Sequence, residues 1–325
     1  MSSTVKVVVG IVVVAVVAVA AYVLIGQDEQ GEEEKVLNVY NWSDYIAEDT
    51  IANFEKETGI KVNYDVFDSN EVLEAKLLAG NTGYDVVVPS GAFLERQIKA
   101  GVFAELNQSK LPNAANLDPT ILAQVAKNDP GNKHAIPYMW GTTGIGYNVA
   151  MVKERLGEVP VDTWDLIFDP TTVEKLADCG VTLLDSPAEV FPAAINYLDL
   201  DPTAKREEDL VKGEELLLKV RPSIKYFHSS QNINDLANGD ICVAMGWSGD
   251  MLIARDRAAE ADAGVEVEYI IPKEGALMWF DLMAVPADAP HPNNAHAFLN
   301  SIMQPEVTAA ISNYVFYANA NVAST

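Results

Sequence analysis

Residues 36–104 alternate between strand-like and helix-like patterns, and this alternation restricts the fold more than any other feature of the chain. The segments 36–40 and 61–66 alternate apolar and polar side chains, as half-buried strands do. Residues 84–88, the third strand, are apolar without alternation, which is typical of a strand covered on both faces. Strands separated by helices in this order predict a parallel sheet and an α/β fold.

Two helices connect these strands. The first has Ile51 and Phe54 on its apolar face and ends at Gly59, a residue type that commonly follows the last helical turn. The apolar stripe of the second helix is expected to consist of Val72, Leu73, Leu77 and Leu78.

A second α/β unit follows an extended run rich in glycine and threonine. This run, residues 135–148, is interpreted as a crossover between two domains. Short apolar strands are predicted at residues 181–184 and 241–245, and residues 265–271 are expected to form a strand that returns towards the first unit. Two domains agree with a length of 325 residues.

Aromatic, hydroxyl and carboxylate side chains directly follow several predicted strands, with no lysine or arginine among them. Open α/β sheets bind ligands at the carboxyl ends of their strands. Ring faces attract ammonium groups by about 0.5–2 kcal/mol each, and carboxylates left unpaired in a closing cleft are costly. The pattern therefore predicts a site for an organic cation, preferably a dication. The candidate ligand-binding residues are Trp42, Ser43, Asp44, Tyr45, Ser90, Glu189, Trp247, Asp250, Trp279 and Asp281.

Each candidate also has a purely structural interpretation. The tryptophans could pack between domains, and Asp44 and Asp250 could cap the helices that follow them. Glu189 has the weakest case, because an acid in the first turn favours any helix. Asp281 is hardest to explain structurally, since it lies in an apolar run where a carboxylate needs a partner.

The sequence offers little support for catalysis, so we expect a protein that is not an enzyme and holds no cofactor and no metal. The four histidines, His134, His228, His291 and His296, fall in loop-like or surface-like contexts without metal-ligand or triad spacing. Paired acids next to aromatic rings leave glycoside hydrolysis as the enzymatic alternative. The 22 lysines and arginines against 47 acids give a net charge of −25, which repels nucleic acid.

Residues 1–26 are predicted to be a membrane anchor or signal segment. The apolar run 7–25 approaches the length needed to cross a bilayer, and an acidic spacer follows at residues 27–35. We favour an uncleaved anchor over a cleaved signal, and either one exports the rest of the chain.

Two cysteines, Cys179 and Cys242, lie in the exported part. A disulfide is the leading interpretation in an oxidising compartment, and two buried thiols are the alternative. Cys179 lies just before one predicted short strand and Cys242 at the start of another, so a bridge would join neighbouring strands.

Several motifs in order along the chain closely resemble the putrescine-binding branch of the polyamine substrate-binding proteins of bacterial ABC transporters. The resemblance covers about residue 36 to the last residue, and its motifs are residues 40–46, 85–90, 137–148, 246–250 and 317–320. It implies a two-lobed type II periplasmic-binding-protein fold with a hinge between the lobes. It also implies that the two cysteines form the usual bridge of the family and that Tyr317 joins the site.

The resemblance further implies how the protein is organised and what it does. Residues 36–140 and 265–325 would form lobe 1, and residues 141–264 would form lobe 2. The protein would be a periplasmic monomer that captures putrescine or spermidine and delivers it to an ABC-transporter permease in the inner membrane. A membrane-anchored polyamine sensor is the alternative.

Two features depart from the family pattern. Position 279 is Trp, where the putrescine branch usually has Phe and spermidine binders have Trp. Family members also continue beyond the equivalent of Thr325 through further helices, so a C-terminally truncated fragment is expected.

Overall fold

The computed structural model describes residues 33–158, 160–203 and 206–324, and residues 36–325 form one compact unit. None of the helices in these ranges is both long enough and apolar enough to cross a bilayer. The apolar run 7–25, which carries the anchor prediction, lies outside the described residues.

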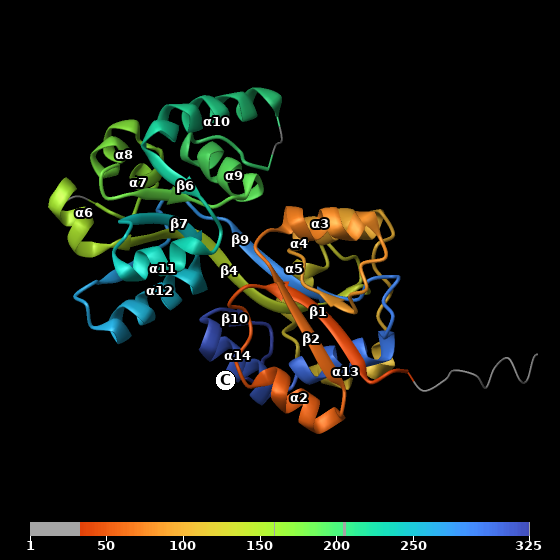
Figure 1. Ribbon diagram of the computed structural model, residues 1–325. Coiled ribbons are helices and arrows are strands. Elements are labelled where there is room, and N and C mark those ends of the chain that lie inside the picture. The colour runs from red at the N-terminus through yellow and green to blue at the C-terminus, as the bar shows by residue number, and fades with distance from the viewer. Residues whose placement is uncertain (1–32, 159, 204–205, 325) are drawn as a thin grey trace, which may run out of the picture. The chain divides into compact units, whose positions relative to one another are not determined.

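The unit is built around one mixed sheet with the strand order β2-β1-β3-β9-β4-β7-β5-β6, to which β8 and β10 add by pairing with β4 (Figure 1). The strands are β1 Val36–Trp42, β2 Lys61–Phe67, β3 Val86–Val87, β4 Ala135–Asn148, β5 Val181–Leu183, β6 Ile224–Phe227, β7 Val243–Trp247, β8 Val267–Ile270, β9 Met278–Ala284 and β10 Ala318–Asn319. β1 pairs in parallel with β2 and β3, as the strand–helix alternation predicts.

Helices follow most of the strands and cover the sheet. They are α2 Thr50–Thr58, α3 Asn70–Ala79, α4 Gly91–Lys99, α5 Pro119–Val125, α6 Val149–Leu156, α7 Asp165–Phe168, α8 Pro170–Leu176, α9 Pro187–Tyr197, α10 Glu207–Val220, α11 Gln231–Asn238, α12 Ser248–Ala261, α13 Pro292–Ile302 and α14 Pro305–Val315. Three short 3-10 helices are η1 Gln108–Lys110, η2 Pro112–Asn116 and η3 Arg221–Ser223.

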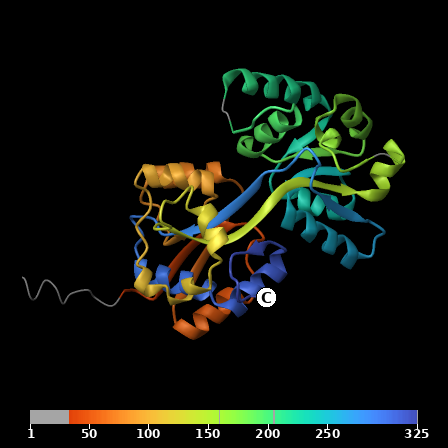
Figure 2. The ribbon, with the colours of Figure 1, turned by 180° about the vertical axis from the view of Figure 1, so that it is seen from behind.

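The 14-residue strand β4 and its partner β9 run between two groups of elements (Figures 1 and 2). Residues 135–142 of β4 pair with β9, whereas residues 143–148 of the same strand pair with β7 and β8. One hydrophobic cluster draws its residues from 37–139 and 282–320, and two others draw theirs from 145–267. The chain therefore builds separate cores at the two ends of β4.

The first predicted helix is confirmed, and the stripe of the second is only half right. Gly59 ends α2 in the left-handed conformation, where its N–H donates to the carbonyl of Glu55. In α3, Leu73 and Leu77 are buried, but Val72 and Leu78 are 51% and 57% exposed. Leu73 and Leu77 share one helix face four residues apart, and only this narrow face packs.

The strand expected to return towards the first unit runs in that direction, antiparallel to β4, but ends before it reaches that unit. β8 pairs with Ile145–Asn148 at the distal end of β4, and the next strand, β9, makes the return. β8 therefore lies beside the second group of elements, because it pairs with the distal end of β4.

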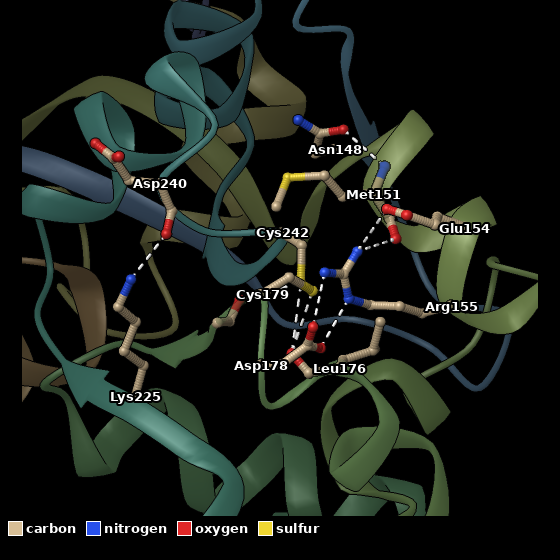
Figure 3. Close-up of a disulfide and its surroundings, with 11 residues drawn as sticks. Asn148, Met151, Glu154, Arg155, Leu176, Asp178, Cys179, Lys225, Asp240 and Cys242 are labelled. Atoms are coloured by element: carbon tan, nitrogen blue, oxygen red, sulfur yellow. Dashed lines mark hydrogen bonds and ion pairs between the residues drawn. A yellow bond between two sulfur atoms is a disulfide. The ribbon is translucent and has the colours of Figure 1, made fainter.

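The predicted disulfide is present between Cys179 and Cys242 (Figure 3). The two residues precede β5 and β7, which pair in parallel with Val181 opposite Val243. Beside the bridge, the guanidinium of Arg155 donates two hydrogen bonds of 2.8 Å to the Asp178 carboxylate. The bridge thus joins neighbouring strands and closes a long stretch of chain.

Candidate functional site

A cavity of about 570 Å³, its open mouth included, lies among the ends of β1, β2, β7 and β9 and the starts of the helices that follow. It brings together ten of the eleven candidate residues, which are Trp42, Ser43, Tyr45, Ser90, Glu189, Trp247, Asp250, Trp279, Asp281 and Tyr317. The lining contains four acids and no lysine or arginine.

Aromatic rings from distant parts of the chain meet in the wall of the cavity. The rings of Trp42 and Trp247 lie edge to face with their centroids 5.4 Å apart, and those of Trp279 and Tyr317 meet similarly at 5.3 Å. The indole N–H of Trp42 donates to the carbonyl of Val88 at 2.8 Å, which holds that ring in place. The packed rings themselves form the wall of the cavity, so the packing of these tryptophans is compatible with a ligand-binding role.

The carboxylate of Asp281 is fixed by two hydroxyl groups. Its Oδ1 accepts a hydrogen bond from Ser90 Oγ at 2.5 Å, and its Oδ2 accepts one from Tyr45 Oη at 2.9 Å. The residue is 5% exposed. Burial raises the pKa of Asp281 to about 7, although both hydroxyls lower it. A cation placed beside this carboxylate would lower the pKa of Asp281 and so oppose the effect of burial.

Asp250 lies in the first turn of α12 and pairs with Tyr317. The Tyr317 hydroxyl donates to Asp250 Oδ1 at 2.7 Å and accepts from the Asp250 N–H at 3.1 Å. Burial raises the pKa of Asp250 to about 7. Gly249 makes this approach possible, because a Cβ atom there would lie 2.4 Å from a carbon of the Tyr317 ring.

Glu189, the weakest candidate from sequence, also reaches the cavity. It lies in the first turn of α9, and the hydroxyl of Thr143 on β4 donates to its Oε2 at 2.6 Å. Burial raises the pKa of Glu189 to about 7; the hydrogen bond from Thr143 lowers this pKa, and the negative charge of Asp281 adds to the increase. Three carboxyl groups that resist ionisation therefore share one cavity.

Asp44 is the candidate residue that the structure places elsewhere. It is absent from the cavity lining, and its carboxylate forms an ion pair of 2.8 Å with Arg257 of α12. The backbone of Asp44 adopts a left-handed conformation, with φ of 51°. Its side chain therefore points in a different direction from those of Ser43 and Tyr45, which line the cavity. The cap interpretation of Asp44 also fails, because α2 begins only at Thr50.

Sequence reasoning missed several polar residues of the lining. Asp68, Ser69 and Asn70 follow β2, and Ser229 and Ser230 follow β6. The rule that selected Trp42 and Ser90 would have found them, since they also lie at the carboxyl ends of strands. Phe67, Ser186 and Ile233 complete the lining.

The histidines take no part in the cavity, and the surface-like context expected for them is wrong in part. His296 lies buried in α13, where its Nε2 accepts the N–H of Asn107 at 2.9 Å. His134 and His291 each lie beside a fully buried aspartate. Over the described ranges, no cluster of histidine, cysteine and acidic residues has the arrangement of a metal site.

The fold and the cavity define a solute receptor, in which the cavity lies between elements connected by β4 and β9. Residues 49–324 match the family described as bacterial extracellular solute-binding protein. The chain belongs to this family.

Particular relatives are similar over most of their length. The putrescine-binding periplasmic protein PotF of Escherichia coli is 62% identical over 295 residues, which cover 90% of this chain and 80% of that protein. The putrescine-binding periplasmic protein SpuD of Pseudomonas aeruginosa is 57% identical over 91% of this chain and 81% of its own. The crystal structure of the spermidine/putrescine ABC transporter substrate-binding protein PotD of Streptococcus pneumoniae matches with a TM-score of 0.68 and 30% identity, covering 88% of this chain and 83% of that one.

Proposed function

We propose that the protein is the substrate-binding component of an ABC transporter and captures a polyamine, putrescine or spermidine, for uptake. The observation that carries this proposal is a cavity with three tryptophans and four acids but no basic residue. Its three inner carboxyl groups have raised pKa values and gain most from a ligand that supplies positive charge. The relatives named for putrescine binding support the same ligand class.

Recognition would combine two interactions. The rings of Trp42, Trp247 and Trp279 would cover the methylene chain and attract the ammonium groups by their faces. Asp281 and Asp250 would accept charge-assisted hydrogen bonds from those ammonium groups, each held in place by hydroxyl partners. A neutral sugar would leave these buried charges uncompensated, which disfavours a carbohydrate ligand.

The wider organisation is part of the proposal. Residues 36–140 and 265–325 would form one lobe and 141–264 the other, with the segment 265–277 attached to the second lobe through the pairing of β8. Bending of the connecting strands would close the lobes on the ligand. The receptor would act outside the cytoplasm as a monomer, tethered by residues 7–25, and would deliver its ligand to a membrane permease.

Calorimetric titration tests the ligand class. The purified protein is titrated with putrescine, cadaverine, spermidine and spermine, and with maltose as a control. We expect saturable binding of at least one polyamine and none of maltose. Asp250→Asn should weaken that binding by about 10- to 100-fold, since a hydrogen bond to a charged group contributes about 1.5–3 kcal/mol.

Asp240→Asn is the matched control, because Asp240 is exposed and lies outside the cavity. It should leave polyamine affinity unchanged. A folded protein that binds no polyamine would refute the proposal. Equal affinities of the Asp250 and Asp240 variants would show that this cavity is not the binding site. Loss of polyamine uptake on deletion of the gene would separate transport from sensing.

A further inference from the structure

Asp68 is the acid at the mouth of the cavity. It follows β2 directly at the carboxyl end of the strand and belongs to the lining. Asp250 and Asp281 are 7% and 5% exposed, whereas Asp68 is exposed to solvent. The cavity therefore has buried carboxylates inside and a separate, solvent-exposed carboxylate at its entrance.

Two hydroxyl groups from different elements fix the carboxylate of Asp68. Ser43, just after β1, donates to Oδ1 at 2.9 Å, and Ser230, just before α11, donates to the same oxygen at 2.7 Å. Both bonds end on Oδ1, and within the described ranges Oδ2 has no hydrogen-bond partner. No lysine, arginine or histidine among those residues forms an ion pair with Asp68. The group is thus oriented without being neutralised.

We propose that Asp68 determines specificity for polyamines longer than a diamine, by accepting a hydrogen bond from a third ammonium group at the mouth of the cavity. The inference rests on the proposed function. In the proposed function, the inner carboxylates Asp250, Asp281 and Glu189 would match the two ammonium groups of a diamine. A triamine extends further, and its additional charge needs an oriented, unneutralised acceptor where the cavity opens. Asp68 is the lining acid at that place.

The substitution Asp68→Asn tests this role in the whole 325-residue chain. Asparagine keeps an oxygen that can accept from Ser43 and Ser230 but removes the negative charge. We expect the Kd for spermidine to rise about fivefold, as for the loss of an exposed ion pair. The Kd for putrescine should stay within about twofold of the wild-type value. Asp240→Asn, an equal change of charge at an exposed residue outside the lining, should alter neither constant.

Four results would overturn the role of Asp68. If Asp68→Asn weakened the binding of spermidine and putrescine equally, Asp68 would act by joining the two sides of the cavity. Unchanged affinity for both would mean that the mouth carboxylate contacts no ligand. A wild-type protein that binds putrescine but not spermidine would leave the proposed function intact and remove this inference. Binding of neither polyamine would remove both, and thermal unfolding of each variant verifies that it is folded.

Discussion

Polyamine affinity should fall steeply when the pH is lowered from 8 to 6. The pKa values of Glu189, Asp250 and Asp281 are each raised to about 7 by burial. An ammonium group beside such a carboxyl stabilises its ionised form, so the bound state carries fewer protons than the free state. The ammonium groups of the ligand resemble a lysine side chain, with pKa near 10, and remain charged throughout this range.

The size of the effect follows from the pKa values. A carboxyl with pKa of about 7 is about nine-tenths ionised at pH 8 and about one-tenth ionised at pH 6. Ionising it for binding therefore costs about tenfold in affinity at pH 6. A dication needs two ionised partners, and the acids titrate together rather than singly. We expect the Kd to increase about a hundredfold between pH 8 and pH 6.

Calorimetry at pH 6, 7 and 8 in two buffers of different ionisation enthalpy measures the affinity and counts the protons released. About one to two protons should leave per ligand at pH 6, and fewer at pH 8. Asp281→Asn removes one titrating group, so its affinity should be weaker at pH 8 but should change less with pH. Asp240→Asn should follow the wild-type curve.

A Kd that changes by less than about threefold from pH 8 to pH 6, without proton release, would refute this reasoning. It would mean that the three carboxyl groups are already ionised in the free protein. An unchanged pH profile in the Asp281 variant, with a normal profile in the wild type, would assign the proton release to other groups.

Three further predictions concern single features of the fold. Gly249→Ala should weaken polyamine binding by about tenfold in calorimetry, because the new Cβ would displace the Tyr317 ring; an unchanged Kd would contradict this. Replacing Cys179 and Cys242 together by serine should lower the free energy of unfolding in urea by about 2–4 kcal/mol; a loss below about 1 kcal/mol would show that the bridge contributes little. Asp44→Asn should alter affinity by no more than about fivefold, since it breaks only a half-exposed ion pair outside the cavity; a larger loss would return this residue to the ligand set.

Much of the fold and of the candidate site could be predicted from the sequence, because the signals are local. Apolar periodicity indicates the strands around Val39 and Val87 and the helices after them. The rule that α/β sheets bind ligands at the carboxyl ends of their strands then indicates Trp42, Ser90 and Trp247, and it needs no distances. Each inference depends on residues within one or two elements of the chain.

Tertiary structure decided what depends on partners far away in the chain. Asp44 and Ser43 are adjacent, yet one pairs with Arg257 and the other with Asp68. No local pattern separates their roles. Asp281 owes its raised pKa to burial produced by the whole assembly of strands and helices. The residue types and their order along the chain determined what chemistry the site could have. The long-range packing decided which of these groups meet, and how far each is removed from water, because both depend on contacts between elements that are distant in the sequence.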